Sequence, residues 1–160
     1  VFFNLYGLET VALRYFNVFG PRQNPDSQYS AVIPKFIKLM MHGKQPVIFG
    51  DGLQSRDFSY VENIVNANLL AAAAPRMKGE TLNIACGESR TLLDLVEGLN
   101  KVLGTNITPI FQPIRKGDVK NSLADISSAG RTINYKPTVG WEEGLNRTVR
   151  WYMDREKSNA

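Results

Sequence analysis

Short apolar runs alternate with longer segments in which apolar residues recur at helical spacing, and this pattern predicts an α/β fold. Runs rich in β-branched and aromatic residues predict strands at residues 10–16, 46–49, 54–58, 81–85 and 107–112. Helical spacing predicts helices at residues 31–41, 61–74, 91–103, 125–134 and from 141 onward. No repeat or low-complexity segment interrupts this order, so we expect a single domain.

Two local patterns make sharper predictions. Residues 50–52 (Gly-Asp-Gly) form a turn signal, and we expect them to join the strands at 46–49 and 54–58 as a hairpin. In the helix that follows residue 60, the apolar spacing predicts a buried face made of Val61, Ile64, Val65, Leu69 and Ala72.

The first seven residues have the pattern of the last turns of a helix that is ended by Gly7. We therefore expect the start of this helix to lie upstream, in a longer parent protein. The 160 residues are 43% hydrophobic and 21% charged, which is typical of a soluble globular domain.

Charge and composition exclude several classes of function. The net charge is +4, but the cations are scattered and no Lys/Arg run is interleaved with aromatic residues, so we expect no nucleic-acid partner. The apolar start of the chain is too short to cross a membrane. Cys86 is the only cysteine, which predicts a reducing, cytoplasmic environment without disulfides. His42 is the only histidine, so the sequence offers too few His and Cys ligands for a transition-metal site, and we expect no Ser-His-Asp triad.

Residues 14–22 carry the strongest chemical signal in the chain. A buried strand ends at the polar Asn17 and is followed by a Gly-Pro turn and Arg22. This order places an amide and a guanidinium at the carboxyl end of a strand, where open α/β sheets bind ligands. Arg56 and Arg115 are further candidate phosphate ligands, because a guanidinium presents a fork of donors to phosphate oxygens.

A second candidate group lies later in the chain. Arg115 precedes Asp118 by three residues, so a cation for a diphosphate stands close to a carboxylate that accepts from ribose hydroxyls. Residues 47–49 offer a flat apolar wall that suits a nucleobase. Each feature also has a plainer interpretation: Arg56 as an ion-paired strand residue, residues 115–118 as a polar turn, and residues 47–49 as a core strand.

Taken in order, these segments resemble the extended short-chain dehydrogenase/reductase family, specifically its NAD-dependent nucleotide-sugar epimerases and dehydratases. The resemblance covers nearly the whole chain. It rests on Arg14-Tyr15-Phe16-Asn17-Val18-Phe19-Gly20-Pro21-Arg22, Ala31-Val32-Ile33-Pro34, Gly50-Asp51-Gly52, Ser55-Arg56-Asp57-Phe58, Asn83-Ile84-Ala85, Gly117-Asp118 and Ala124-Asp125-Ile126-Ser127. It implies the C-terminal half of an extended Rossmann-type fold: the last sheet strands plus the smaller substrate-binding subdomain, over residues 1–160, without the N-terminal NAD-binding part.

The resemblance also implies ligands and roles. It implies a UDP-sugar as substrate, NAD as cofactor and a homodimer in the intact parent. Phe16 would lie near the nicotinamide ring. The implied substrate-binding residues are Asn17 at the diphosphate or sugar, Ala31, Val32, Val47 and Phe49 around the uracil, Arg56 and Arg115 at the diphosphate, and Asp118 at the ribose.

Ser122 indicates which sugar the substrate carries. Family members restricted to plain hexoses carry a Tyr at this place, and a serine leaves room for an N-acetyl group. The chain therefore most resembles the bacterial UDP-N-acetylglucosamine 4-epimerases, unless Ser122 merely begins an extended stretch. A 4,6-dehydratase, a decarboxylase, a glucuronate epimerase and a non-catalytic nucleotide-binding fragment are the alternatives.

The family's catalytic parts are missing from the sequence. Its base is a Tyr four residues before a Lys, and no tyrosine here has a lysine at that spacing. The Gly-x-Gly-x-x-Gly cofactor turn is missing as well. We therefore predict that the chain holds no catalytic residue and converts no substrate by itself.

Overall fold

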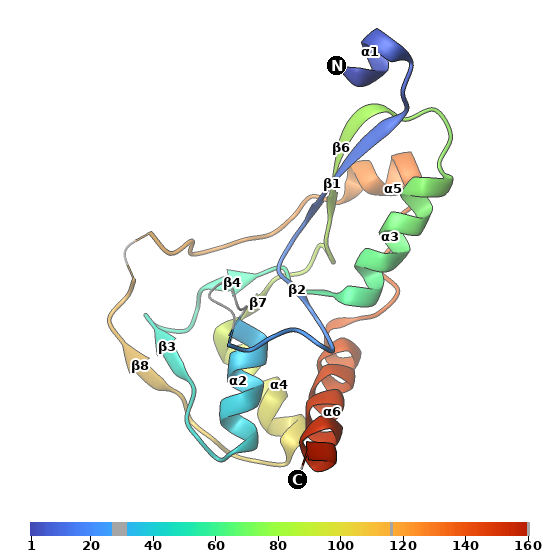
Figure 1. The fold of residues 1–160 in the computed structure, drawn as a ribbon. Helices are drawn as coiled ribbons and strands as arrows, with labels where there is room; N and C mark the ends of the chain where they lie inside the picture. The colour runs from blue at the N-terminus through green and yellow to red at the C-terminus, as the bar shows by residue number, and fades with distance from the viewer. Residues whose placement is uncertain (27–31, 116, 160) are drawn as a thin grey trace.

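The computed structural model describes residues 1–26, 32–115 and 117–159, and it confirms the predicted α/β class (Figure 1). In chain order the elements are α1 (Phe2–Tyr6), β1 (Thr10–Tyr15), β2 (Val18–Phe19), α2 (Val32–Met41), β3 (Val47–Phe49), β4 (Ser55–Arg56), β5 (Ser59–Tyr60), α3 (Val61–Ala73), β6 (Lys78–Ile84), β7 (Arg90–Thr91), α4 (Leu92–Leu103), β8 (Ile110–Gln112), α5 (Ser127–Ile133) and α6 (Trp141–Asn159). Within the described ranges, no helix has the length and apolar character needed to cross a membrane.

The strands pair between segments that are far apart in the chain. β1 and β6 run in parallel, with Leu13 opposite Leu82. β2 pairs in parallel with β5, and β3 with β8, while β4 and β7 are antiparallel. Because β3 and β8 are parallel, the residues that follow β8 start beside the carboxyl end of β3.

The hairpin predicted after Phe49 is wrong, since β3 and β4 do not pair with each other. Instead, Gly50 N donates to Gln112 O at 2.8 Å and continues the β3–β8 pair. Gly50 and Gly52 then adopt φ values of 94° and 79°, which glycine tolerates without strain. Gln54 Nε2 donates to Phe49 O at 2.7 Å and closes the loop with a side chain in place of a strand ladder.

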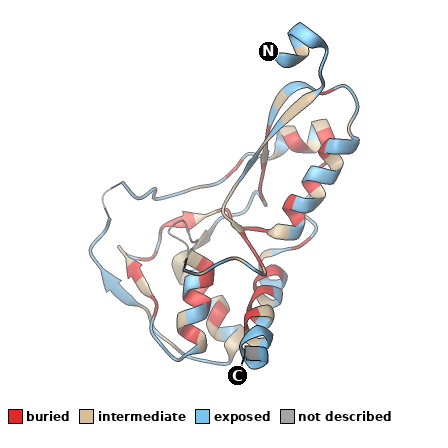
Figure 2. Cartoon of the chain, viewed as in Figure 1, coloured by how far each residue is buried: buried red, intermediate tan, exposed pale blue. Residues whose placement is uncertain are grey.

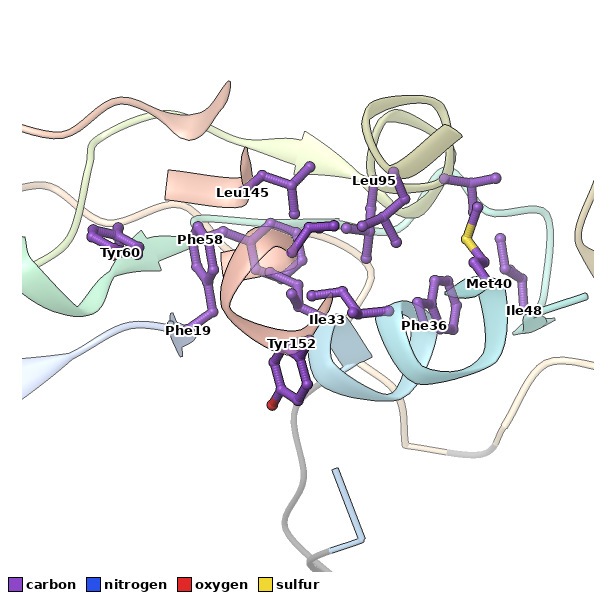
Figure 3. Packing of buried hydrophobic residues seen from close by; sticks show 14 of the residues in the cluster. Phe19, Ile33, Phe36, Met40, Ile48, Phe58, Tyr60, Leu95, Leu145 and Tyr152 are labelled. Carbon is purple, nitrogen blue, oxygen red and sulfur yellow. The ribbon is translucent and has the colours of Figure 1, made fainter. Parts of the chain in front are cut away.

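Apolar side chains form two cores, visible as buried positions in Figure 2. The first lies among α3, α5 and β6 and includes Leu82 and Ile84. The second is enclosed by α2, α4 and α6, and Figure 3 shows Phe36 and Met40 of α2 beside Ile48 of β3. This second core anchors β3 and so fixes the position of its carboxyl end.

α3 is rotated relative to the face that its apolar pattern predicts, although Ile64 of that face is buried as expected. Val65 and Leu69 are 53% and 66% exposed, so their predicted burial is wrong. The inward face carries the fully buried Asn63, whose Oδ1 accepts from Thr138 N and Val139 N, both at 2.9 Å. Asn63 Nδ2 also donates to Val139 O at 2.8 Å. These bonds to a distant loop set the rotation of the helix, because a buried amide must be satisfied.

Helix ends follow the local signals. α1 ends at Gly7, whose φ of 66° is left-handed as predicted. α4 starts with a complete capping box, in which Asp94 N donates to Thr91 Oγ1 at 3.0 Å and Thr91 N donates to Asp94 Oδ2 at 2.8 Å.

Candidate nucleotide site

The short strand β4 is joined to two distant segments, and this brings Arg56 next to residues 118–122. β7 pairs with β4 in the antiparallel sense, with Arg56 opposite Arg90. The later segment bonds to Ser55, whose N donates to Lys120 O at 2.8 Å and whose O accepts from Ser122 N at 3.0 Å. The backbone of Ser122 is therefore held one residue away from Arg56.

Arg56 and Asp118 form a close ion pair within this arrangement. Arg56 Nη2 lies 2.6 Å from Asp118 Oδ1, and Arg56 Nη1 donates to Ser55 O at 2.9 Å. The two side chains are 17% and 34% exposed, so the pair is partly shielded from water and its geometry is better defined than that of a surface pair. A guanidinium has five N–H donors, which leaves donors for an oxyanion ligand.

An aromatic surface lies beside this pair, at the end of β3. The Arg115 guanidinium carbon stands 3.6 Å from the centre of the Phe49 ring, which is a cation–π contact. Asp118 N donates to Arg115 O at 3.3 Å, so the cation and the carboxylate belong to one turn. A cavity of about 160 Å³ opens here, lined by Phe49, Gly50, Asp51, Gln54, Ile114, Asp118, Val119 and Lys120.

Asn17 follows β1 and reaches the same region from the other core. Its φ is 36°, a left-handed value that asparagine tolerates better than most residues. Asn17 Nδ2 donates to Asp57 O at 3.1 Å and Asn17 O accepts from Ser59 N at 3.2 Å. The amide is thereby placed beside the residue that follows Arg56. The half-buried Phe16 precedes it, and its N donates to Ile84 O at 3.2 Å.

In the part of the chain that the structure describes, the remaining sequence-predicted residues form no hydrogen bond or ion pair with Arg56 or Asp118. Val32 begins α2 and packs against the core among α2, α4 and α6. Val47 lies half-buried in β3, two residues before Phe49. Arg22 is exposed and has a φ of 68°. Ala31 lies outside the described residues.

Asp57 was not predicted from the sequence as part of the site, yet it holds the surroundings of Arg56 together. The side chain is fully buried. Its oxygens accept from three backbone amides, Cys86 N at 2.9 Å, Gly87 N at 3.0 Å and Ala124 N at 3.3 Å. Burial raises the pKa of Asp57 above its usual 3.8, although the three amide donors act in the opposite direction. An acidic residue after a strand is an ordinary turn signal, so the pattern alone could not reveal partners so far along the chain.

Together these groups suit a ligand with a flat ring, hydroxyls and phosphate, which is the chemistry of a nucleotide. The fold corresponds to the C-terminal half of Rossmann-type epimerase structures. The chain belongs to the NAD dependent epimerase/dehydratase family, whose sequence model matches residues 2–85.

Solved structures and curated relatives agree with this membership. The UDP-N-acetylglucosamine 4-epimerase from Methanobrevibacter ruminantium M1, in complex with UDP-N-acetylmuramic acid, is 48% identical with a TM-score of 0.89, over 96% of this chain and 49% of that protein. The UDP-glucose 4-epimerase from Thermotoga maritima, with UDP-glucose, is 38% identical with a TM-score of 0.90, over 97% and 49%. A UDP-N-acetyl-alpha-D-glucosaminuronate decarboxylase from Bacillus cytotoxicus is 30% identical, over 95% of this chain and 49% of the relative. The chain thus spans about half the length of the relatives it matches.

The residues present do not make a site for NAD by themselves. The sequence contains no Gly-x-Gly-x-x-Gly turn that would receive the diphosphate of a dinucleotide. Of the described residues, only Phe16 was expected near the nicotinamide, and an aromatic ring alone holds no dinucleotide.

Proposed function

We propose that this chain holds the UDP part of the substrate in an NAD-dependent 4-epimerase that acts on UDP-N-acetylglucosamine, UDP-N-acetylgalactosamine or related UDP-hexoses. The observation that supports this most strongly is the grouping of Arg56, Asp118 and Ser122 beside Phe49 and Arg115. The five residues come from two segments, residues 49–56 and 115–122, that lie far apart in the sequence, so this grouping is a property of the fold.

Each group has a defined part in the proposal. Phe49 and Val47 border the uracil, and Asp118 accepts from the ribose hydroxyls. Arg56 and Arg115 hold the diphosphate with charge-assisted hydrogen bonds. Asn17 contributes a neutral amide toward the diphosphate or sugar, as an N–H donor or through its carbonyl oxygen.

The value of such a site for epimerisation lies in separating binding from chemistry. Inversion at the sugar C4 requires the sugar to present both faces in turn, so contacts to the sugar cannot all be tight. Binding energy from the remote nucleotide holds the substrate while the sugar ring moves. The catalytic Tyr and Lys and the NAD-binding residues belong to the other half of the intact protein, for which a cytoplasmic homodimer is part of the same proposal.

Ser122 carries the proposed preference for N-acetyl sugars. Its backbone is fixed by its hydrogen bond to Ser55, and its small side chain is half-buried. We expect Ser122→Tyr to weaken UDP-N-acetylglucosamine binding about tenfold or more and to leave UDP-glucose binding nearly unchanged. Equal losses for both sugars would contradict this role.

Binding measurements on the purified chain test the proposal. Calorimetric titration with UDP should give saturable binding, and Arg56→Ala and Arg115→Ala should each weaken it about 10- to 100-fold. Arg150→Ala, an exposed arginine on α6, is the matched control. If both site variants bind like wild type, the diphosphate assignment fails. Incubation of the chain with NAD and UDP-sugars should give no C4 inversion, and observed inversion would refute the predicted lack of catalytic residues.

A second candidate keeps the nucleotide site and changes the reaction. The decarboxylase relative shows that the family acts on UDP-sugars by more than one reaction. The deciding experiment is an assay of the intact parent protein against a panel of UDP-sugars, with product identification for epimerisation, dehydration and decarboxylation. Saturable UDP binding without any of these products would favour a non-catalytic nucleotide-binding role.

A further inference from the structure

The ionisable side chains of α2 and of the turn after it are all basic. Lys35, Lys38 and His42 recur at helical spacing, so they share one exposed face of the helix. Lys44 stands just beyond the helix end. The sequence has no aspartate or glutamate in residues 27–50, so no acidic residue of this stretch balances the lysines. A local excess of positive charge attracts anionic partners.

The helix itself accounts for only part of this set. Cations near a helix C-terminus complement the helix dipole, which explains Lys38 and His42. His42 also helps to close the helix, because its Nδ1 donates to Lys38 O, 2.7 Å away. Lys35 lies in the first turn, where the dipole disfavours a cation, and Lys44 lies outside the helix. These two lysines require an explanation beyond the stability of α2.

A groove runs beside this basic face, and we call it the α2 groove. Its volume is about 710 Å³, and it is lined by Pro25, Asp26, Lys35, Lys38, Leu39, His42 and Lys44. Volumes of this order are typical of protein sites that take a ligand with several functional groups. Leu39 and Pro25 give the groove apolar surface among the basic side chains.

The chain's own carboxylates indicate what this face binds. Both carboxylate oxygens of Asp26 contact Lys38 Nζ, at 2.9 and 3.0 Å. From α6, Glu156 Oε1 lies 3.6 Å from His42 Nε2. Within the described ranges, Lys35 and Lys44 form no ion pair. Carboxylates of the chain therefore approach two of the basic residues, and two lysines are left for carboxylates from outside.

We infer that the α2 groove docks an acidic peptide segment of a partner protein. The carboxylates of the peptide pair with Lys35 and Lys44, and one of its apolar side chains contacts Leu39. This inference goes beyond the proposed UDP-sugar function and does not depend on it. The complementary charges supply specificity and a faster encounter, while each exposed ion pair adds only modest affinity.

The lining of the groove favours a peptide over other anionic partners. Bases of single-stranded nucleic acid stack on aromatic side chains, and the described residues that line the groove include no Phe, Tyr or Trp. A helix that lies on an anionic membrane inserts Trp, Phe or Leu into the lipid, whereas Leu39 is half-buried beside the lysines. A concave site with separate point charges suits a flexible chain of carboxylates.

Fluorescence anisotropy with the labelled peptide Glu-Glu-Leu-Glu-Glu tests the inference on the purified chain. Wild type should bind it saturably and more weakly at high salt. The double variant Lys35→Glu/Lys44→Glu should weaken binding about tenfold or more, because two attractive contacts become repulsive. Lys78→Glu/Lys136→Glu makes the same change of net charge at exposed lysines elsewhere and should weaken binding less than about threefold.

A variant that should strengthen binding adds a change of opposite sign. Asp26→Asn removes the carboxylate that occupies Lys38, so the peptide should bind about two- to threefold more tightly. Asp154→Asn on α6 changes the net charge equally and should leave the affinity unchanged. Equal effects of these two substitutions would show that only the overall charge matters, which contradicts a docking groove.

The remaining outcomes also decide for or against the groove. Equal weakening by the two double variants would overturn the inference, as would the absence of saturable peptide binding. Tighter binding of single-stranded oligo-dT or of phosphatidylserine vesicles than of the peptide would assign the face to another class of partner. Circular dichroism checks that each variant is folded. For a variant that does not fold, wild type decides alone: binding of Gln-Gln-Leu-Gln-Gln as tight as that of the acidic peptide would refute the role of the lysines.

Discussion

Replacing Asp57 by asparagine tests how the chain positions Arg56. The Asp57 carboxylate accepts at Oδ1 from Cys86 N and at Oδ2 from Gly87 N and Ala124 N. Asparagine keeps one oxygen and replaces the other by an NH2 group, which is a donor. In the more favourable orientation the remaining oxygen accepts from Gly87 N and Ala124 N, and Cys86 N faces the side-chain NH2 group, which is itself a donor.

The magnitude follows from these contacts. One buried N–H left without an acceptor costs about 1–3 kcal/mol, and two charge-assisted bonds become neutral ones at about 0.5–1 kcal/mol each. Removing a charge from a buried place offsets part of this, as the raised pKa of Asp57 indicates. We expect Asp57→Asn to lower the free energy of unfolding by about 2–3 kcal/mol.

Urea denaturation at pH 7, followed by circular dichroism, measures this loss. Asp154→Asn on the exposed side of α6 makes the same chemical change and should stay within about 0.5 kcal/mol of wild type. If Asp57→Asn is as stable as this control, the three amide contacts do not stabilise the fold and the account of Asp57 is wrong.

Two further predictions concern packing and pH. A Cβ on Gly144 would lie 2.9 Å from Tyr60 Cβ, so Gly144→Ala should lower the free energy of unfolding by about 1–3 kcal/mol. A Cβ on Gly130 would have its nearest neighbour at 3.6 Å, so Gly130→Ala should raise the free energy of unfolding by about 0.5–1 kcal/mol through the helix propensity of alanine in α5. Similar shifts of the urea midpoint in the two variants would contradict this. The Tyr135 hydroxyl donates to Ala85 O at 2.9 Å, and burial raises the pKa of Tyr135. The contribution of Tyr135 to the free energy of unfolding is therefore complete below pH 10 and is lost as the pH rises further. Tyr135→Phe should lower the free energy of unfolding by about 1 kcal/mol at pH 8. Above pH 10 this free energy should fall less steeply with pH in Tyr135→Phe than in wild type or in the control Tyr6→Phe, and an equally steep fall would refute the assignment.

Elements defined by local signals could be predicted from the sequence. α4 has its capping box at Thr91 and apolar residues at helical spacing, and α1 ends at Gly7. Both signals act within a few residues, so the chain elsewhere has little influence on them. The α/β class follows from the same local patterns.

Pairing and rotation could not be predicted in this way, because they depend on distant partners. The glycine turn after Phe49 looks like a hairpin, but β3 pairs with β8 more than 60 residues later. The inward face of α3 is set by Asn63, whose partner Val139 lies 76 residues away. Asp57 escaped prediction for the same reason: its importance lies in burial and in contacts with distant backbone amides, which a single residue in a sequence does not display.

The candidate site was predictable as a set of residue types but not as a geometry. Arg56, Arg115 and Asp118 are the groups that phosphate and ribose recognition requires, and the family resemblance ordered them. Their pairing across β4 and the stacking of Arg115 on Phe49 depend on how the two cores hold these segments together.

The most direct test of the account is an amide ¹H–¹⁵N NMR titration of the chain with UDP. A nucleotide site at the end of β3 predicts saturable shifts of the Phe49, Gln54, Arg56, Asp118 and Ser122 amides, with a common dissociation constant. Shifts confined to the groove between α4 and α6, or no saturable shifts at these five residues, would contradict the nucleotide site.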